Sequence, residues 1–395
     1  METQILVLNS GSSSLKFQVL AMPSETRICQ GMVERIGAGD ARLHYRTAGH
    51  KETRPVQAPD HGQALERIVD ALLDATHGVL RNTSEIAAVG HRVVHGGTRF
   101  SDTTPVTPEV RDAIAELSRL APLHNPHNLE GIRLAEALFP EALQVAVFDT
   151  AFHQTIPLQA RKYALPEELY EKHGVQVYGF HGTSHKYVSQ QLADRLPPDG
   201  KLISLHLGNG CSATAIRGGK SVDHSLGFTP SGGLVMGTRS GDIDHGIVFY
   251  LIGSLGYTPE QAEALLTRQS GLLGLTGYSD LRDVEREAEA GNEACRLALE
   301  ITAYRIRKYI GAYTAVLNGL DGLVFTAGIG EHSSRMRELV CKDLEAMGIV
   351  LDPERNRRPG PGIQELHAHG SRVSIWVVPT DEELEIARQA FAVLG

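Results

Sequence analysis

The sequence contains few cysteines, and none of them lie close together. They are Cys29, Cys211, Cys295 and Cys341, and no C-x-x-C pair occurs. Disulfide-rich secreted domains and cysteine zinc sites both depend on closely spaced cysteines. The spacing therefore argues against both classes and favours a reducing compartment, which we expect to be the cytoplasm.

The sequence also lacks an excess of basic residues and a long apolar run. It has 38 Lys and Arg against 47 Asp and Glu, a net charge of −9 at pH 7. Proteins that bind nucleic acid or anionic membranes normally carry the opposite sign. No apolar stretch approaches the roughly 20 residues of a spanning helix, and the start, METQILVLNS, lacks the basic segment of a signal peptide. We therefore expect no nucleic-acid partner and no membrane association.

Several common catalytic motifs are missing as well. The sequence has no G-x-S-x-G elbow, no H-E-x-x-H pair, no G-x-x-x-x-G-K-[ST] loop and no G-x-G-x-x-G fingerprint. An acyl-enzyme hydrolase, a P-loop enzyme and a dinucleotide-binding domain are therefore poorly supported.

Histidine, by contrast, is abundant. There are 18 histidines, of which 12 fall between His91 and His332. Some are spaced three or four residues apart, as in His91/His95, His124/His127 and His181/His185. Such pairs can bind zinc, but neither i,i+4 pair encloses a carboxylate that could act as ligand or base. A zinc hydrolase, capped or solvated side chains, and groups that contact an anion all stay open as interpretations.

The chain reads as an α/β protein of two or three domains. At about 150 residues per domain, 395 residues suggest that number. Short apolar runs that end in Gly, Ser, Asn or Asp predict strands at Ile5–Leu8, Ala87–Val89, Val145–Phe148, Leu202–Leu207, Leu323–Thr326 and Val373–Val378. Helical periodicity predicts helices at Pro108–Leu120, Asn128–Leu138, Glu260–Thr267 and Ala294–Leu317. Strands interleaved with helices favour parallel or mixed sheets, and Arg355–Gly362 is expected to be a surface loop.

Two segments half a chain apart resemble each other. ILVLNSGSSSLKFQV begins at Ile5 and LISLHLGNGCSATAI begins at Leu202. Aligning Gly11 with Gly208 gives an offset of 197 residues (208 − 11), half of 395. A chance likeness of two hairpins is the alternative, but a duplicated α/β unit explains both the pattern and the offset.

Three glycine-rich turns are candidates for binding phosphate. They are Asn9–Ser14 followed by Lys16, Leu207–Cys211, and Ala327–Glu331. Glycine lets backbone N–H groups approach an anion closely, and hydroxyl and ammonium groups add further donors. Each turn could equally be an ordinary connection, but three of them favour a nucleotide site.

Charged side chains follow several of the predicted strands. Arg92 lies just beyond the strand at Ala87–Val89, and Asp149 follows the strand at Val145–Phe148. His181 and Arg239 lie among glycines. Ligands of open α/β sheets bind at such strand ends. Arg239 could instead pair with Asp242. Arginines, histidine and acidic groups beside glycine turns suit phosphoryl transfer, which depends on positioning and charge neutralisation.

The motifs together resemble the acetate kinase family. The match runs in order through NSGSSSLKF, HRVVHGG, LAPLHNP, FDTAFHQTIP, YGFHGTSH, HLGNG, GFTPSGGLVMGTRSGDID, AGIGE and PTDEE. The resemblance implies an actin-like ATPase fold of two duplicated ribonuclease H-like domains around a nucleotide cleft. The first domain would span residues 1–150, joined by a C-terminal helix at 383–395, and the second would span residues 151–382.

The resemblance also implies roles for individual residues. The catalytic residues would be Arg92, His124, Asp149, His181 and Arg239. Asn9 and Glu382 would hold Mg²⁺, with Mn²⁺ as a substitute. The residues that bind ATP or ADP would be Ser12, Ser14, Lys16, His206, Leu207, Gly208, Asn209, Gly210, Asp280, Leu281, Arg282, Gly328, Ile329, Gly330, Glu331 and His332.

The implied reaction is transfer of the ATP γ-phosphoryl group to acetate, directly and reversibly, giving acetyl phosphate. Beside Arg92, the acyl pocket would contain Val94, Leu123, Phe180 and Pro230. Because one methylene changes the free energy by only about 1–3 kcal/mol, a propionate kinase is the runner-up. The resemblance further implies a homodimer. Two residues depart from the family pattern. His332 replaces an amide in the expected nucleotide-binding turn, and His245 stands where proline is frequent; we expect such changes to affect nucleotide binding.

Overall fold

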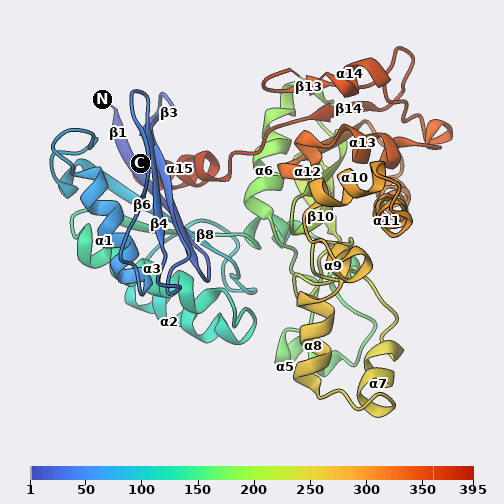
Figure 1. Ribbon diagram of the computed structural model, residues 1–395, viewed down its shortest axis with the longest axis horizontal. Coiled ribbons are helices and arrows are strands. Elements are labelled where there is room, and N and C mark those ends of the chain that lie inside the picture. The colour runs from blue at the N-terminus through green and yellow to red at the C-terminus, as the bar shows by residue number, and fades with distance from the viewer. Residues whose placement is uncertain (1, 359) are drawn as a thin grey trace. The chain divides into compact units, whose positions relative to one another are not determined.

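The computed structural model describes residues 2–358 and 360–395 (Figure 1). Its internal contacts divide the chain into two compact units. Unit 1 comprises Met1–Phe152 and Asp381–Gly395, and unit 2 comprises His153–Thr380. Glu382 therefore lies in unit 1, together with the N-terminal half of the chain.

Unit 1 contains an eight-stranded sheet in the order β5-β4-β3-β2-β1-β6-β8-β7. Its strands are β1 (Thr3–Ser10), β2 (Ser14–Met22), β3 (Thr26–Glu34), β4 (Arg42–Thr47), β5 (Lys51–Pro55), β6 (Ile86–Val93), β7 (Thr104–Pro105) and β8 (Leu143–Phe148). Strands β1 to β5 pair antiparallel in succession, β6 runs parallel to β1, and β8 runs parallel to β6. The carboxyl ends of β1, β6 and β8 therefore lie at one edge of the sheet.

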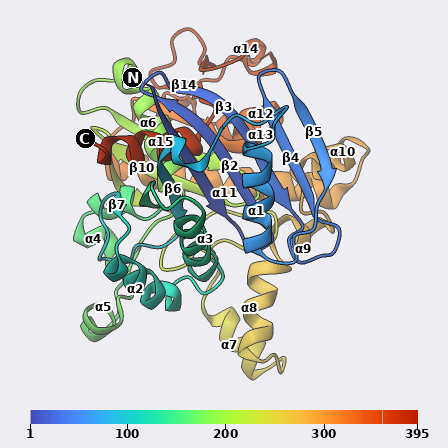
Figure 2. The same ribbon diagram turned by 90° about the vertical axis from the view of Figure 1, so that its left-hand side faces the viewer.

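Helices cover both faces of this sheet (Figure 2). They are α1 (His61–Leu72), α2 (Pro108–Glu116), α3 (Asn125–Leu138) and α15 (Glu382–Val393). The middle of strand β1, Ile5–Leu8, is a continuous apolar run: Leu6 packs in the core formed with α1, whereas Ile5 packs in the core formed with α15. Because side chains alternate along a strand, a continuous apolar run serves two cores. Gly90 allows α15 to approach β6, since a Cβ there would lie 2.7 Å from Ile386.

Unit 2 contains a six-stranded sheet in the order β11-β10-β9-β12-β14-β13. Its strands are β9 (Lys201–Leu207), β10 (Cys211–Arg217), β11 (Lys220–His224), β12 (Gly322–Thr326), β13 (Gln364–Glu365) and β14 (Ser374–Val377). Its helices are α4 (Leu158–Arg161), α5 (Glu167–His173), α6 (Gly182–Gln191), α7 (Gly246–Gly253), α8 (Pro259–Arg268), α9 (Gly271–Thr276), α10 (Leu281–Glu289), α11 (Glu293–Leu317), α12 (Ala327–His332), α13 (Ser334–Cys341) and α14 (Pro353–Arg357). Helices α6, α11 and α12 all pack against β9.

The two sheets share one plan. The order β3-β2-β1-β6-β8 in unit 1 corresponds to β11-β10-β9-β12-β14 in unit 2, with the same parallel and antiparallel neighbours. Strand β1 ends at Ser10 and β9 ends at Leu207, again 197 residues apart. The prediction of a duplicated α/β fold is confirmed.

Two local predictions are wrong. The sequence predicts a turn at Ala327–Glu331, but these residues form helix α12, which begins with Ala327 in a left-handed conformation (φ 64°). The expected loop at Arg355–Gly362 is helical in its first three residues, which belong to α14, and Pro359 lies outside the described residues. Within the described residues, no helix is both long enough and apolar enough to cross a membrane.

Candidate active site

In unit 1, the half-buried side chain of Arg92 lies at the carboxyl ends of the parallel strands. The register that pairs Leu8 with His91 brings Asn9 close to Arg92. The Nη1 atom of Arg92 donates to Asn9 Oδ1 at 3.4 Å, and its Nη2 atom forms an ion pair with Asp149, which follows β8. The Nε atom of Arg92 is buried and lies 4.0 Å from the Glu382 carboxylate. The sheet and α15 thus bring together four of the residues that the sequence singles out.

The carboxyl group of Glu382, the first residue of α15, has an unusual ionisation. Burial raises its pKa to about 7; Arg92 opposes this rise, whereas Asp149 and Glu383 add to it. Negative charge around this arginine is therefore not fully balanced. Carboxylate and amide oxygens are the ligands that Mg²⁺ prefers, so Asn9 and Glu382 fit such an ion in their chemistry and charge.

Three other predicted residues of unit 1 lie at the loop before α3 and after β6. His124 occupies the N-cap position of α3, and its backbone N–H donates to Ala121 O at 3.0 Å. Val94 is buried, whereas the Leu123 side chain is 52 % exposed. Leu123 is therefore open to solvent within its own unit.

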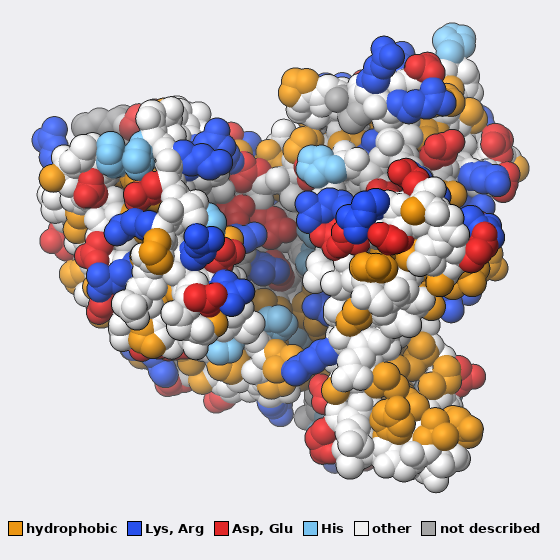
Figure 3. All heavy atoms as spheres, viewed as in Figure 1, with side chains coloured by type: hydrophobic (Ala, Val, Ile, Leu, Met, Phe, Trp, Pro, Cys, Tyr) orange, Lys and Arg blue, Asp and Glu red, His pale blue; other side chains and the backbone are white. Residues whose placement is uncertain are grey.

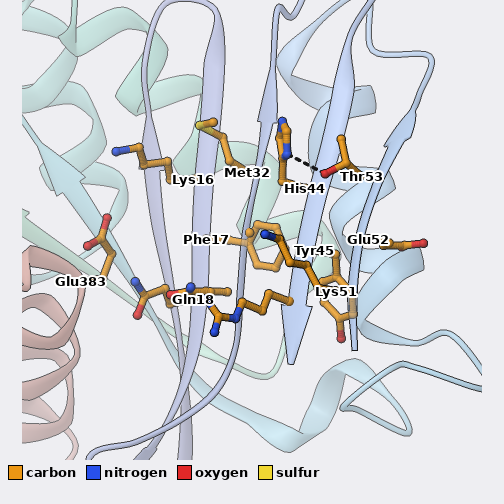
Figure 4. A pocket seen from close by; sticks show the side chains of 13 residues that line it. Lys16, Phe17, Gln18, Met32, His44, Tyr45, Lys51, Glu52, Thr53 and Glu383 are labelled. Atoms are coloured by element: carbon orange, nitrogen blue, oxygen red, sulfur yellow. Dashed lines mark hydrogen bonds between the residues drawn. The ribbon is translucent and has the colours of Figure 1, made fainter. Parts of the chain in front are cut away.

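The first glycine-rich turn joins β1 to β2. It is closed by a hydrogen bond from Gly11 N to Ser14 O at 2.8 Å, and Ser12 is exposed at its tip. Lys16 pairs with Asn9 across the hairpin and lines a pocket of about 400 Å³ on the open face of β2–β5 (Figure 4). Figure 4 shows Lys16 and Glu383 on the same side of this pocket.

One group among the described residues has the composition of a metal site: His61, His127 and Glu130, whose ligand atoms lie within 4.8 Å of one another. His61 Nε2 donates to Gly11 O at 2.7 Å, so this histidine also supports the first turn. The group includes neither Asn9 nor Glu382. Of the three histidine pairs, His127 alone belongs to it, and His91 instead bonds Gln144 at 2.8 Å.

In unit 2, two predicted catalytic residues face the turn between β9 and β10. A Cβ atom placed on Gly210 would lie 3.5 Å from His181 Nε2 and 3.7 Å from Arg239 Nη1. His181 precedes α6 in a left-handed conformation (φ 54°), a strained geometry that is common at functional sites. The same Nη1 atom donates to Pro230 O at 2.8 Å.

Arg239 and Asp242 do not pair with each other, although the sequence left that pairing open. Asp242 accepts hydrogen bonds from Gly233 N at 2.6 Å and from the Tyr309 hydroxyl at 2.6 Å. Phe180, one of the two pocket residues of this unit, is buried, and its carbonyl accepts a hydrogen bond from His153 Nε2 at 3.0 Å.

The histidines of unit 2 are bonded to buried hydroxyl groups. His181 Nδ1 and His185 Nε2 both bond Ser212 Oγ, at 2.9 and 2.8 Å, and His206 Nδ1 bonds Ser184 Oγ at 2.8 Å. Burial lowers the pKa of His185 well below its ordinary value, and the neighbouring histidines lower it further. Several of the histidines of unit 2 thus form one hydrogen-bonded cluster behind the β9–β10 turn.

A pocket of about 660 Å³ in unit 2 collects half of the residues predicted to bind ATP. Those that line it are Gly208, Asn209, Asp280, Leu281, Arg282, Gly328, Ile329 and His332. Its size suits a nucleotide or another ligand of that class. Asp280 caps α10 through Arg282 N, and the guanidinium of Arg282 lowers the pKa of its carboxyl to about 2.

Comparisons of the sequence and of the fold with known proteins identify the family. Residues 4–388 match the model of the acetokinase family. The chain belongs to the acetokinase family. A protein of Flavobacterium johnsoniae named acetate kinase is 55 % identical over 99 % of both chains. The crystal structure of Porphyromonas gingivalis acetate kinase superposes with a TM-score of 0.94, with 44 % identity and full coverage of both chains. A propionate kinase structure from Francisella tularensis has a TM-score of 0.93, with 41 % identity over 99 % of both chains. The family resemblance stated from the motifs is confirmed.

Some residues of this acetokinase-family pocket are not found by sequence reasoning. Gly237, Leu272, Ser279, Glu285 and Ser333 also line it. They come from α9, α10 and three loops, so tertiary packing rather than a local motif brings them together. The Ser333 hydroxyl donates to Glu285, whose pKa is raised by burial. No local motif signals this pair.

Arg337 is a further residue that the sequence does not reveal. It is fully buried on α13 and donates to Gly330 O at 2.8 Å and Glu331 O at 2.9 Å. Burial lowers its pKa to about 10. Gly330 and Glu331, both predicted to bind ATP, are thus held through their carbonyl groups rather than lining the pocket.

The two departures from the family pattern have different surroundings. His332 is exposed at the end of α12 and lines the pocket, so it is placed to affect a bound nucleotide. His245 caps α7 and lies edge-to-face with Phe249, with ring centroids 6.3 Å apart. His245 therefore contacts residues of α7 and does not line the pocket.

Proposed function

We propose that this protein is an acetate kinase that transfers the ATP γ-phosphoryl group reversibly to acetate, giving acetyl phosphate and ADP. The observation that carries the proposal is the convergence of His181 Nε2 and Arg239 Nη1 on one glycine turn, Gly210, whose neighbours Gly208 and Asn209 line a nucleotide-sized pocket. Two donors beside a turn of this kind suit a phosphoryl group in transfer.

The acceptor needs little chemical activation. A short carboxylic acid, with a pKa near 4.3 like that of Glu, is already ionised at neutral pH and requires no general base. One carboxylate oxygen attacks the γ-phosphorus in line, and the bond from that phosphorus to the β,γ-bridging oxygen breaks as ADP leaves. No phosphoenzyme forms. The main barrier is the meeting of two anions, which positive charge relieves.

The arginines supply that charge. Guanidinium groups stay ionised and bind carboxylate or phosphate oxygens in a bidentate manner. Arg92 and Arg239 would orient the acetate and the transferring phosphoryl group, His181 and His124 would donate hydrogen bonds to them, and Asp149 would fix the Arg92 guanidinium. Asn9 and Glu382 would hold Mg²⁺ or, in its place, Mn²⁺. The bound ion supplies charge neutralisation on the ATP phosphates.

Acceptor size would be set by apolar side chains. Val94, Leu123, Phe180 and Pro230 suit a methyl group, and acetate is accordingly the preferred substrate. A propionate kinase is the second candidate, since the propionate kinase of Francisella tularensis has nearly the same fold.

Hydroxylamine trapping tests the reaction directly. Purified protein is incubated with ATP, Mg²⁺ and acetate, and acyl phosphate is detected as the acyl hydroxamate, with ATP or acetate omitted as controls. We expect hydroxamate only in the complete mixture. Its absence with acetate and every other short acid would refute a carboxylate kinase, and zinc-dependent hydrolysis without ATP would point to the histidine-based alternative.

A homodimer in the cytoplasm completes the proposal. Apolar side chains gather on and after α7, where Ile247, Phe249, Tyr250 and Leu255 are 44, 70, 58 and 54 % exposed (Figure 3). A patch of this kind suits a self-interface. Light scattering should give twice the chain mass for the wild type and the single mass for a Phe249→Asp variant. A wild-type monomer would refute the dimer.

The cysteines support the proposed location in the cytoplasm. All four are free and buried, as suits a reducing compartment.

A further inference from the structure

Four buried or half-buried side chains of unit 2 form a continuous hydrogen-bonded row. His181 Nδ1 bonds Ser212 Oγ at 2.9 Å, Ser212 Oγ bonds His185 Nε2 at 2.8 Å, and His185 Nδ1 bonds Ser204 Oγ at 2.8 Å. Ser204, Ser212 and His185 are each 0 % exposed. Only His181, at the end of the row, is partly exposed.

The fold explains why these four groups meet. Ser204 on β9 pairs with Thr214 on β10, and Ser212 lies two residues before Thr214. Because cross-strand partners and residues two apart share a face of the sheet, both serines point to the same side. Helix α6 packs on β9, and His185 lies one turn after His181 in the sequence. One helix turn against one strand pair therefore builds the row.

Counting hydrogens restricts how the row can be arranged. A neutral imidazole has one donor and one acceptor nitrogen, and a serine hydroxyl carries a single hydrogen. Ser212 can therefore donate to His181 or to His185, but not to both. His185 is neutral because its charged form would be desolvated, so its two nitrogens must have opposite roles.

Two polarities place the Ser212 hydrogen within the row. In the first, Ser204 donates to His185 Nδ1, His185 Nε2–H donates to Ser212, and Ser212 O–H donates to His181 Nδ1. Neutral His181 then carries its hydrogen on Nε2. In the second polarity every bond is reversed, Nδ1 of His181 is the donor, and Nε2 carries a hydrogen only if the ring is a cation. With a neutral ring, the second polarity would aim a lone pair at the turn of Gly210, where an anion would be repelled. In a third arrangement Ser212 accepts from both histidines, and a neutral His181 again carries its hydrogen on Nδ1.

We propose that Ser212, oriented by His185 and Ser204, is a positioning residue that keeps neutral His181 protonated at Nε2. This rests on the proposed function, in which Nε2–H donates to the transferring phosphoryl group. The position of Nε2 beside Gly210 and Arg239 Nη1 makes it the nitrogen that matters. The histidine thus acts by donating a hydrogen bond, with no proton transferred at any step.

The test compares Ser212→Ala with Ser189→Ala. Ser189 is also buried, but it lies on α6 and its hydroxyl donates to Lys186 O, outside the row. We expect Ser212→Ala to lower kcat by about 10- to 100-fold, as misorientation of a reacting group does, while KM for acetate and ATP changes little. Ser189→Ala should keep kcat within about twofold, and Ser212→Thr, which restores a hydroxyl, should recover part of the loss.

A spectroscopic measurement decides the mechanism of the loss. In ¹⁵N-histidine-labelled protein, the wild type should show His181 with hydrogen on Nε2 and an unprotonated Nδ1, and Ser212→Ala should show a mixture of both tautomers. Wild-type His181 with its hydrogen on Nδ1, or an unchanged kcat in Ser212→Ala, would overturn the proposal. If Ser212→Ala does not fold, the wild-type spectrum alone decides.

A His181→Ala variant separates this inference from the proposed function. If His181→Ala keeps full activity, the assigned role of His181 is wrong. If His181→Ala loses activity while Ser212→Ala does not, only the role of Ser212 is wrong.

Discussion

The two arginines assigned to the reaction differ in what balances their charge. Arg92 lies against the carboxylates of Asp149 and Glu382. Arg239 instead donates to the Pro230 carbonyl and contacts the sulfur of Met236 at 3.6 Å. Burial lowers its pKa, and among the described residues only Cys211 opposes this effect. A guanidinium in such surroundings keeps its charge available for an anionic ligand.

Replacement of Arg239 should therefore lower catalytic efficiency strongly and change the stability of the fold little. We expect Arg239→Ala to lower kcat/KM for acetate by at least about 1,000-fold, which corresponds to about 4 kcal/mol of transition-state stabilisation. The unfolding midpoint should change little. Hydroxamate formation and denaturant unfolding measure the two quantities.

Arg296→Ala is the matched control. Arg296 is exposed on α11 of the same unit and pairs with Glu293 and Glu300 at the surface. Exposed pairs contribute about 0–1 kcal/mol, so this variant should keep both activity and stability. Near-normal activity in Arg239→Ala would remove that residue from the mechanism.

Among the elements, the β9–β10 turn has the most direct link to chemistry. Gly210 does not adopt a left-handed conformation, so alanine is compatible with its backbone. Its added Cβ would lie 3.5 Å from His181 Nε2, where it would crowd a bound phosphoryl oxygen without striking the protein. Gly210→Ala should thus lower kcat/KM at least about tenfold, with unfolding free energy within about 1 kcal/mol of the wild type.

Gly49, in the turn between β4 and β5, provides the comparison. A Cβ there has nothing within 4 Å, so Gly49→Ala should leave activity unchanged. Equal activity of the two glycine variants would mean that the turn at Gly210 is not close to the substrate.

The elements also show how far sequence patterns reach. Strands such as β9 and β12 are predictable because a buried parallel strand needs a continuous apolar, β-branched run. Helix α12 is not, because Gly328 and Gly330 disfavour a helix locally. The buried guanidinium of Arg337 holds its last carbonyls from outside, and no local pattern contains that contact.

Residues of the candidate site likewise divide into those that sequence patterns predict and those that they do not. Residues at strand ends, such as Arg92 and Asp149, could be predicted because the carboxyl ends of parallel strands meet at one edge. Ser212 and Glu285 could not, since their neighbours lie 27 to 48 residues away in the chain. Strand register and helix packing decide those contacts.

At the scale of the whole molecule, buried histidines make stability sensitive to acid. Burial lowers the pKa of His91 and His95 to about 4, and it lowers the pKa of His185 and His224 well below its ordinary value. The unfolded chain takes up protons near pH 6.5, whereas the native protein does not, so stability is lost as pH falls from 6.5 towards 4. Each histidine contributes a slope of about 1.4 kcal/mol per pH unit in this range.

The sign is opposite for buried acidic groups of unit 2 such as Asp223. Burial raises the pKa of Asp223 to about 6, so its protonation stabilises the native state as pH falls through 6. The contribution of a single histidine to the pH dependence of stability must therefore be measured with a variant. His224→Gln should reduce the acid dependence of the unfolding free energy by about 1.4 kcal/mol per pH unit between pH 6 and 5. Urea unfolding followed by the fluorescence of Trp376, which is buried in unit 2, measures the slope. Equal slopes would show that His224 is protonated in the native protein.

The central claim is that the enzyme phosphorylates a small carboxylate and is built for acetate. The ratio of kcat/KM for acetate, propionate and butyrate, with saturating ATP and Mg²⁺, tests it most directly. We predict the highest value for acetate and a value about 10- to 200-fold lower for propionate, since one methylene changes the free energy by about 1–3 kcal/mol. A higher value for propionate would contradict the assignment to acetate, and phosphorylation of none of the three would contradict the account as a whole.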